Sequence, residues 1–250
     1  MSNQIQRSNN KEKKIAAWEK IIFPLDVPDK DTAQVWVKKL SGRVGVFKVG
    51  LELFVKEGPD ILAMISDHGG AKIFLDLKFH DIPATMAAAL KSASAYHPLL
   101  LTIHPDQGDR LREGVLAVQD QNTTVLGVTV LTSIGEADLP GMGMDKNLTM
   151  ENLVDLRVEL AQKAGCGGIV CSGLEVKRIR ERFGKNLVIV TPGIRPLFSL
   201  DTTEDQQRIA TPAQALRDGS DYLVIGRPIR KAADPLEAVA RIVEEMGNIL

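Results

Sequence analysis

The chain has 250 residues, of which 44% are hydrophobic, and 31 basic residues balance 32 acidic ones to give a formal net charge of −1. This length suits one domain with a sizeable core, and the balanced charge argues against a nucleic-acid partner. The sequence lacks the run of about 18 apolar residues that a membrane-spanning helix needs, so no membrane partner is expected.

The first 19 residues are polar and carry three lysines, and they lack the apolar segment of a signal peptide. We therefore expect a cytoplasmic protein. We also expect an N-terminal extension over residues 1–19, partly disordered and partly helical, ahead of one catalytic domain over residues 20–250. Cys166 and Cys171 are too few for a zinc site or a disulfide framework, and they are predicted to be reduced core residues.

From residue 21 onward, short β-rich runs alternate with segments of helical periodicity. Strands are predicted over residues 21–27, 46–49, 73–79, 99–104, 125–131, 168–171, 187–190 and 222–225. Helices are predicted over residues 32–40, 54–68, 84–95, 111–120, 148–164, 175–183, 212–218 and 235–246. Eight strand-then-helix units predict an α/β fold, a single-domain (β/α)8 TIM barrel. A doubly wound sheet is the alternative, but no Gly-rich dinucleotide loop follows the first strand.

The third predicted strand carries the main functional signal. Side chains alternate along a strand, so Asp76 and Lys78 share one face. The opposite face is wholly apolar, with Ile73, Leu75, Leu77 and Phe79. Asp81 follows in the next turn, and Lys48 lies on the second strand. Together these charges predict an alternating array, in which a pair about 4 Å apart attracts by roughly 4 kcal/mol at an effective dielectric of about 20. Such charges are fixed before substrate arrives, as electrostatic catalysis requires.

The active site of such a barrel lies at the carboxyl ends of its strands. Asp26 ends the first strand, and Thr132 and Ser133 end the fifth. The loops after the last two strands commonly bind phosphate, and here they carry Arg195, Gly226 and Arg227. The long polar loop between them, residues 196–210, is expected to close over the phosphate, with Gln206 or Arg208 reaching inward. These residues predict a phosphorylated small-molecule substrate.

At these residues the chain closely resembles the orotidine 5′-phosphate decarboxylase family over nearly all of residues 21–246. The family's D-x-K-x-x-D signature is present as Asp76, Lys78 and Asp81, followed by Ile-Pro-Ala-Thr. Its other motifs occur in the family's order along the chain, at residues 25–26, 47–50, 131–133, 191–195, 205–208 and 226–227. The resemblance implies decarboxylation of orotidine 5′-monophosphate to UMP and CO₂ in pyrimidine biosynthesis, with no cofactor and no metal.

The resemblance also implies roles for the charged residues. Lys78 would protonate C6 of the pyrimidine, and Asp76 would lie against the departing carboxylate. Lys48 and Asp81 would hold the array, while Asp26 and Lys48 would bind ribose hydroxyls.

The remaining implied roles concern substrate binding and assembly. Thr132 and Ser133 would contact the pyrimidine region. The phosphate would be held by Gln206, Gly226 and Arg227, with Arg195 nearby. Asp81 and Thr85 would reach into the neighbouring subunit's site, which implies a homodimer.

Two other functions and several plainer interpretations stay open. A metal-dependent sugar-phosphate decarboxylase or aldolase of the same superfamily would place a carboxylate at the position of Lys48 to bind Mg²⁺. A non-catalytic phosphometabolite-binding barrel would need neither Asp76 nor Lys78. Asp26 could cap the first helix. His104 is interpreted as structural, in a turn, residues 104–108, that departs from the family's usual small Gly/Ala-rich sequence.

Overall fold

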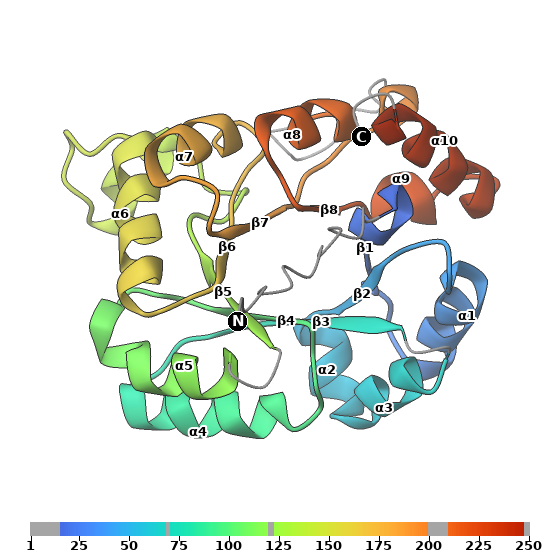
Figure 1. Cartoon of the computed structure of the whole chain (residues 1–250), viewed down its shortest axis with the longest axis horizontal. Coiled ribbons are helices and arrows are strands. Elements are labelled where there is room, and N and C mark those ends of the chain that lie inside the picture. The colour runs from blue at the N-terminus through green and yellow to red at the C-terminus, as the bar shows by residue number, and fades with distance from the viewer. Residues whose placement is uncertain (1–15, 69–70, 120–122, 200–209, 248–250) are drawn as a thin grey trace, which may run out of the picture.

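The structure is a computed structural model that describes residues 16–68, 71–119, 123–199 and 210–247. Eight parallel strands close into a barrel in chain order, and the last strand pairs with the first. The helices surround the strands (Figure 1). The predicted (β/α)8 barrel is therefore confirmed, and the doubly wound alternative is wrong.

The structure gives the following bounds. The strands are β1 Ile21–Pro24, β2 Val46–Val49, β3 Lys72–Phe79, β4 Leu100–Ile103, β5 Thr124–Val128, β6 Gly168–Val170, β7 Val188–Thr191 and β8 Tyr222–Val224. The α-helices are α1 Lys30–Leu40, α2 Leu51–Glu57, α3 Asp60–Ser66, α4 Pro83–Ser94, α5 Arg112–Gln119, α6 Met150–Lys163, α7 Val176–Phe183, α8 Pro212–Asp218, α9 Arg227–Arg230 and α10 Pro235–Gly247. The 3-10 helices are η1 Ala17–Lys20, η2 Gly108–Leu111, η3 Glu136–Asp138, η4 Pro140–Met142 and η5 Leu197–Ser199.

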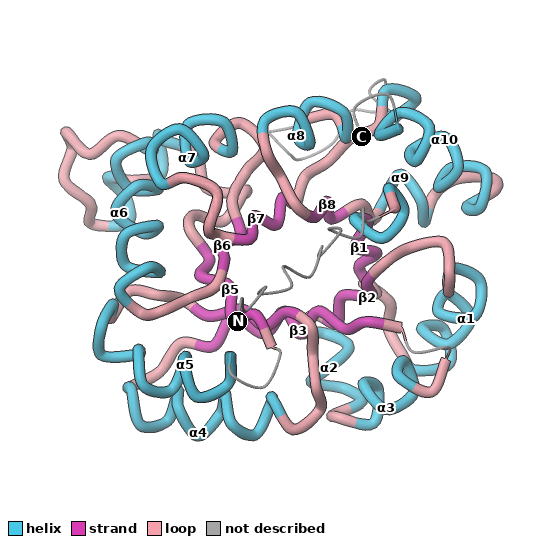
Figure 2. Tube along the Cα trace, in the orientation of Figure 1, coloured by secondary structure: helices cyan, strands magenta, loops and turns pink. Residues whose placement is uncertain are grey.

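Alternation along the strands divides the core into two layers. One cluster fills the inside of the barrel and consists of Ile22, Val46, Phe74, Leu100, Leu126 and Val190. The larger cluster lies between strands and helices. It includes Ile73 and Leu75, which flank Phe74 in the sequence and point to the opposite face of β3. Figure 2 shows the ring of helices that covers this outer face. Because apolar side chains fill the barrel, polar groups that face its axis are concentrated at the strand ends.

Apart from the helix predicted over residues 54–68, each predicted helix begins within two residues of an observed one. Asp29 caps α1 and accepts a 2.9 Å hydrogen bond from the backbone N of Thr32, so Asp26 is not the cap. The helix predicted over residues 54–68 is wrong, because the chain forms α2 and α3 instead. Gly58 lies between them with a φ of +63°, and Pro59 follows it. Glycine tolerates this left-handed conformation, and proline at the next position cannot continue the preceding helix. The four-residue α9 was not predicted.

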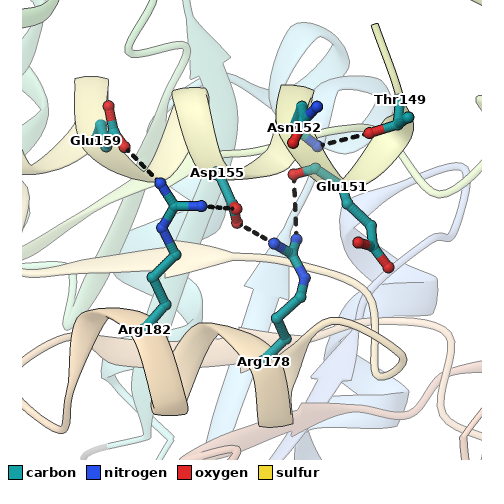
Figure 3. Close-up of polar contacts among 7 residues, drawn as sticks. All are labelled: Thr149, Glu151, Asn152, Asp155, Glu159, Arg178 and Arg182. Carbon is teal, nitrogen blue, oxygen red and sulfur yellow. Dashed lines mark hydrogen bonds and ion pairs between the residues drawn. The ribbon is translucent and has the colours of Figure 1, made fainter.

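An ion-pair cluster joins α6 to α7 (Figure 3). Asp155 on α6 is 4% exposed and accepts hydrogen bonds from Arg178 and Arg182 of α7. Arg182 also donates to Glu159 at 3.2 Å, and Arg178 donates to the backbone O of Glu151 at 3.2 Å. A buried carboxylate with two arginine partners fixes how these two helices pack.

Both cysteines are free and buried, as predicted. Burial raises the pKa of the Cys166 thiol to about 12 and that of Cys171 well above its ordinary value. Of the predicted N-terminal extension, residues 1–15 lie outside the described residues, and η1 forms the last part of the helical lead-in. None of the helices in the described ranges is long and apolar enough to cross a membrane.

Candidate active site

Four charged side chains lie in a row at the carboxyl ends of β1 to β3. The Nζ of Lys78 is 2.8 Å from Asp76 Oδ1, and the Nζ of Lys48 is 3.4 Å from Asp76 Oδ2. Lys48 Nζ is also 3.5 Å from Asp26 Oδ1. Asp76 and Lys48 are nearly buried, with side chains 12% and 13% exposed, whereas Lys78 and Asp26 are 29% and 53% exposed. The row therefore alternates in sign and opens toward solvent at both ends.

Lys78 reaches Asp76 through an irregular end of β3. Leu75 pairs with Leu101, but Phe79 pairs with Ile103, so two extra residues are inserted on β3. Lys78 has a φ of +49°, which is uncommon for a residue with a side chain. The insertion shifts the pairing of β3 with β4 but keeps the predicted faces, because Leu77 and Phe79 pack against the same cluster as Ile73 and Leu75. Lys78 lies beside Asp76, as the alternation predicts.

The charge state of Asp76 follows from its neighbours. Burial is the largest single effect on the Asp76 carboxyl and raises its pKa, whereas the charges of Lys48 and Lys78 lower it. Hydrogen bonds from Lys78 and Thr102 act in the same direction as the lysine charges, so the pKa of Asp76 lies below its ordinary value. Asp76 is consequently ionised at neutral pH despite its burial.

A cavity of about 130 Å³ opens beside this row. Asp26, Lys48, Asp76 and Lys78 bound it on one side, and the first residues of α2 bound it on the other. Gly50 precedes α2, and a Cβ added there would come within 3.2 Å of Lys48 Nζ. The backbone of Gly50 thus passes close to the ammonium group that links the two carboxylates.

Within one chain, Asp81 and Thr85 do not join the charged row. Both are exposed. The Asp81 carboxylate accepts a 2.7 Å hydrogen bond from the backbone N of Ile82, which is itself 65% exposed. Thr85 lies in the first turn of α4. Both side chains therefore lie on the outer surface of the monomer, beside an exposed apolar residue.

The residues predicted to bind phosphate lie after β7 and β8. Arg195 is 8% exposed, and its backbone N donates to the O of Ala210 at 2.9 Å. Gly226 precedes α9, and the partly buried Arg227 is the first residue of that helix. Gln206 and Arg208 lie outside the described residues.

Thr132 and Ser133 lie in the loop that follows β5. Thr132 is partly buried, and Ser133 is exposed.

Sequence reasoning missed the part played by Thr102. This β4 residue is fully buried, accepts from the backbone N of Lys78 at 3.0 Å, and donates to Asp76 Oδ1 at 3.0 Å. The available signal was its spacing, because Thr102 lies two positions after Leu100 and so faces the barrel interior one layer higher. A polar residue at such a position faces the ends of its neighbouring strands.

A histidine pair lies at the rim beside β4. The rings of His80 and His104 are 5.3 Å apart, and His80 Nε2 is 3.5 Å from Asp106 Oδ2. Arg157 also approaches Asp106, at 3.6 Å. Burial lowers the pKa of His104 even though Asp106 acts to raise it. These contacts fit the structural interpretation of His104. Among the described residues, no group of three or more His, Cys, Asp and Glu side chains could hold a metal ion.

Comparison with known proteins gives consistent matches over the barrel. A model of the orotidine 5′-phosphate decarboxylase / HUMPS family matches residues 19–242. The chain is 46% identical over 244 residues to orotidine 5′-phosphate decarboxylase of Syntrophotalea carbinolica, covering 94% of this chain and 98% of that one. It is 45% identical over 233 residues to the enzyme of the same name from Desulfosudis oleivorans, covering 92% of this chain and 94% of that one. The crystal structure of orotidine 5′-phosphate decarboxylase from Lactobacillus acidophilus superposes with a TM-score of 0.78 at 33% identity, covering 90% of this chain and 98% of that one.

Proposed function

The chain belongs to the orotidine 5′-phosphate decarboxylase / HUMPS family, and we propose that its row of alternating charges converts orotidine 5′-monophosphate to UMP and CO₂. The chain is an enzyme of this kind, and the reaction belongs to pyrimidine biosynthesis. The observation that carries the mechanistic proposal is the buried, ionised Asp76 held between Lys48 and Lys78.

The reaction needs a positive charge beside the carbon that loses the carboxylate. When the bond between C6 and the carboxylate breaks, its electron pair stays on C6 and CO₂ leaves. The Lys78 ammonium stabilises this charge by about 5 kcal/mol at about 3.5 Å and an effective dielectric of about 20. It then transfers a proton from Nζ to C6 to give UMP, and solvent returns a proton to the amine. Lys78 therefore serves as both electrostatic stabiliser and general acid.

Asp76 acts on the bound substrate rather than on the carbanion. Its fixed negative charge would lie against the substrate carboxylate, which is poorly stabilised there and is relieved when CO₂ departs. An interaction that is less unfavourable in the transition state than in the ground state lowers the barrier. Lys48 keeps Asp76 ionised throughout, because its Nζ contacts the oxygen that Lys78 does not.

The rest of the substrate is held away from C6. We assign the ribose hydroxyls to Asp26 and Lys48, and the pyrimidine edge to Thr132 and Ser133. The phosphate is assigned to Arg195, Gln206, Gly226 and Arg227. Binding energy from this distant phosphate contributes when it is expressed in the transition state.

We also propose a homodimer in which Asp81 and Thr85 complete the neighbouring site. The exposure of both residues beside Ile82 supports this arrangement. Asp81 lies outside the charged row of its own chain, and the Asp81 carboxylate of a second copy would add the second anion that the row lacks near Lys78. The cytoplasmic location expected from the sequence stays a prediction.

The test of the catalytic assignment is Lys78→Ala in metal-stripped protein, with orotidine monophosphate consumption followed by ultraviolet absorbance. Loss of the charge and of the proton donor predicts a fall in kcat of at least about 10⁵-fold, with nucleotide still bound. Lys72→Ala removes an exposed lysine at the other end of β3 and should leave kcat unchanged. Substantial activity in Lys78→Ala would refute its role. Activity lost on metal removal and restored by Mg²⁺ would favour the metal-dependent alternative.

The shared site is tested by mixing two inactive variants, Lys78→Ala and Asp81→Asn. In a hybrid dimer, one site carries both substitutions. The other site is intact, with Lys78 from the Asp81→Asn subunit and Asp81 from the Lys78→Ala subunit. Random exchange makes half the dimers hybrids, so about a quarter of the wild-type rate should return. No recovery, with subunit exchange verified by mass spectrometry, would refute the composite site.

A further inference from the structure

We infer that Thr102 is a positioning residue for the decarboxylation, because its single hydroxyl joins the backbone of Lys78 to the carboxylate of Asp76. The inference rests on the proposed function and adds a residue that contacts no substrate. Thr102 lies on β4, is fully buried, and faces the barrel axis one layer above Leu100.

The direction of its hydrogen bonds is fixed. The backbone N of Lys78 donates to Thr102 Oγ1 at 3.0 Å, so the hydroxyl oxygen is an acceptor in that bond. A threonine hydroxyl has one hydrogen, and the neighbouring carboxylate of Asp76 can only accept. Thr102 therefore donates to Asp76 Oδ1 at 3.0 Å. With the 2.8 Å bond from Lys78 Nζ to the same oxygen, three hydrogen bonds close a ring through three residues.

This ring fixes two features on which the chemistry depends. The first is the left-handed backbone of Lys78, with a φ of +49°, whose N–H is paired by Thr102. The second is the orientation of the Asp76 carboxylate. Oδ1 accepts hydrogen bonds from Thr102 Oγ1 and Lys78 Nζ, and Oδ2 forms the ion pair with Lys48 Nζ at 3.4 Å. Without the hydroxyl, the partly buried N–H of Lys78 would lose its partner, and the carboxylate could turn between the two lysines.

Other buried threonines of this barrel make a different kind of bond. The hydroxyl of Thr123 donates to the backbone O of Pro98 at 2.9 Å, at the amino end of β5. That bond joins neutral groups and lies at the opposite end of the barrel from the charged row. Thr123→Val is therefore a matched control that removes a buried hydroxyl of the same size.

The experiment compares Thr102→Val, Thr102→Ser and Thr123→Val with the wild type. Thr102→Val keeps the branched shape and should lower kcat about 10- to 100-fold, which corresponds to the loss of one charge-assisted hydrogen bond. Its KM should stay within about threefold, because Thr102 touches no substrate. Thr102→Ser should recover most of the rate. Thr123→Val should lose comparable thermal stability and keep its kcat. Thr102→Ala provides the same comparison if the valine variant does not fold.

A second readout does not depend on activity. Removing the Thr102 donor should raise the pKa of Asp76, measured by carbon-13 NMR titration of its labelled carboxyl carbon, and Thr123→Val should not. An unchanged Asp76 titration in Thr102→Val, or a kcat within twofold of wild type, would overturn the inference, as would a serine variant as slow as the valine variant. Wild-type protein without decarboxylase activity would instead refute the proposed function, and the titration would still decide whether Thr102 acts on Asp76.

Discussion

Replacing Asp76 by asparagine removes the anion between Lys48 and Lys78 while keeping the size of the side chain. The two attractions lost act over 2.8 and 3.4 Å. At an effective dielectric of about 20, they amount to about 6 and about 5 kcal/mol before desolvation is counted. Burial of each ion costs several kcal/mol in return, and removal of one partner from a buried pair typically costs about 3–5 kcal/mol. Because Lys78 is 29% exposed and can turn toward water, we expect Asp76→Asn to lower the free energy of unfolding by about 2–4 kcal/mol at pH 7.

The lowered pKa of Asp76 determines how this difference in the free energy of unfolding depends on pH. The pKa of Asp76 in the folded protein lies below its ordinary value of 3.8, so the carboxylate stabilises the fold at every pH above that value. The contribution is lost as the pH falls through the lower, folded pKa. The stability difference between wild type and Asp76→Asn should therefore be constant from pH 8 to about pH 5 and should shrink below about pH 4.

Urea titration followed by circular dichroism measures this difference at each pH. Asp109→Asn replaces an exposed carboxylate in η2 and serves as the control, with an expected change within about 0.5 kcal/mol. An Asp76→Asn protein as stable as wild type at pH 7, or a difference already lost at pH 6, would refute the reasoning.

Two further predictions concern the scaffold. Asp155→Asn should lower the free energy of unfolding by about 1–3 kcal/mol with kcat unchanged, because Arg178 and Arg182 lose their shared buried partner. Glu159 is more exposed, so Glu159→Gln should lower the free energy of unfolding by less than about 1 kcal/mol. If thermal unfolding showed Glu159→Gln to be the less stable variant, the role given to Asp155 would be contradicted. Because burial raises the pKa of Cys166 to about 12 and that of Cys171 well above its ordinary value, neither thiol should react with a disulfide reagent at pH 8 until urea unfolds the chain. Rapid labelling of the native protein would show that at least one thiol is accessible.

Strand alternation and helix signals were sufficient to predict the barrel, because both depend on local periodicity. The split of residues 54–68 into α2 and α3 could have been read from Gly58 and Pro59, yet the apolar periodicity continues across them and favoured one helix. The site was predictable as residue types at strand ends. The geometry of the site could not be predicted, because the two-residue insertion in β3 depends on its pairing with β4, which is distant in sequence. Thr102 escaped notice for the same reason, since its hydroxyl matters only through residues 24 and 26 positions earlier.

The filled barrel has a consequence for how the products leave. Phe74 lies on β3 two positions before Asp76 and belongs to the six-residue cluster that occupies the barrel interior, where every member is at most 2% exposed. In the proposed mechanism carbon dioxide forms next to Asp76, at the carboxyl ends of the strands. The buried apolar side chains of this cluster lie between that point and the amino end of the barrel. We therefore expect carbon dioxide and the nucleotide to leave, and the water that reprotonates Lys78 to enter, at the carboxyl end of the barrel, beside the cavity at the charged row. The order of these exchanges is then part of the proposed catalytic cycle.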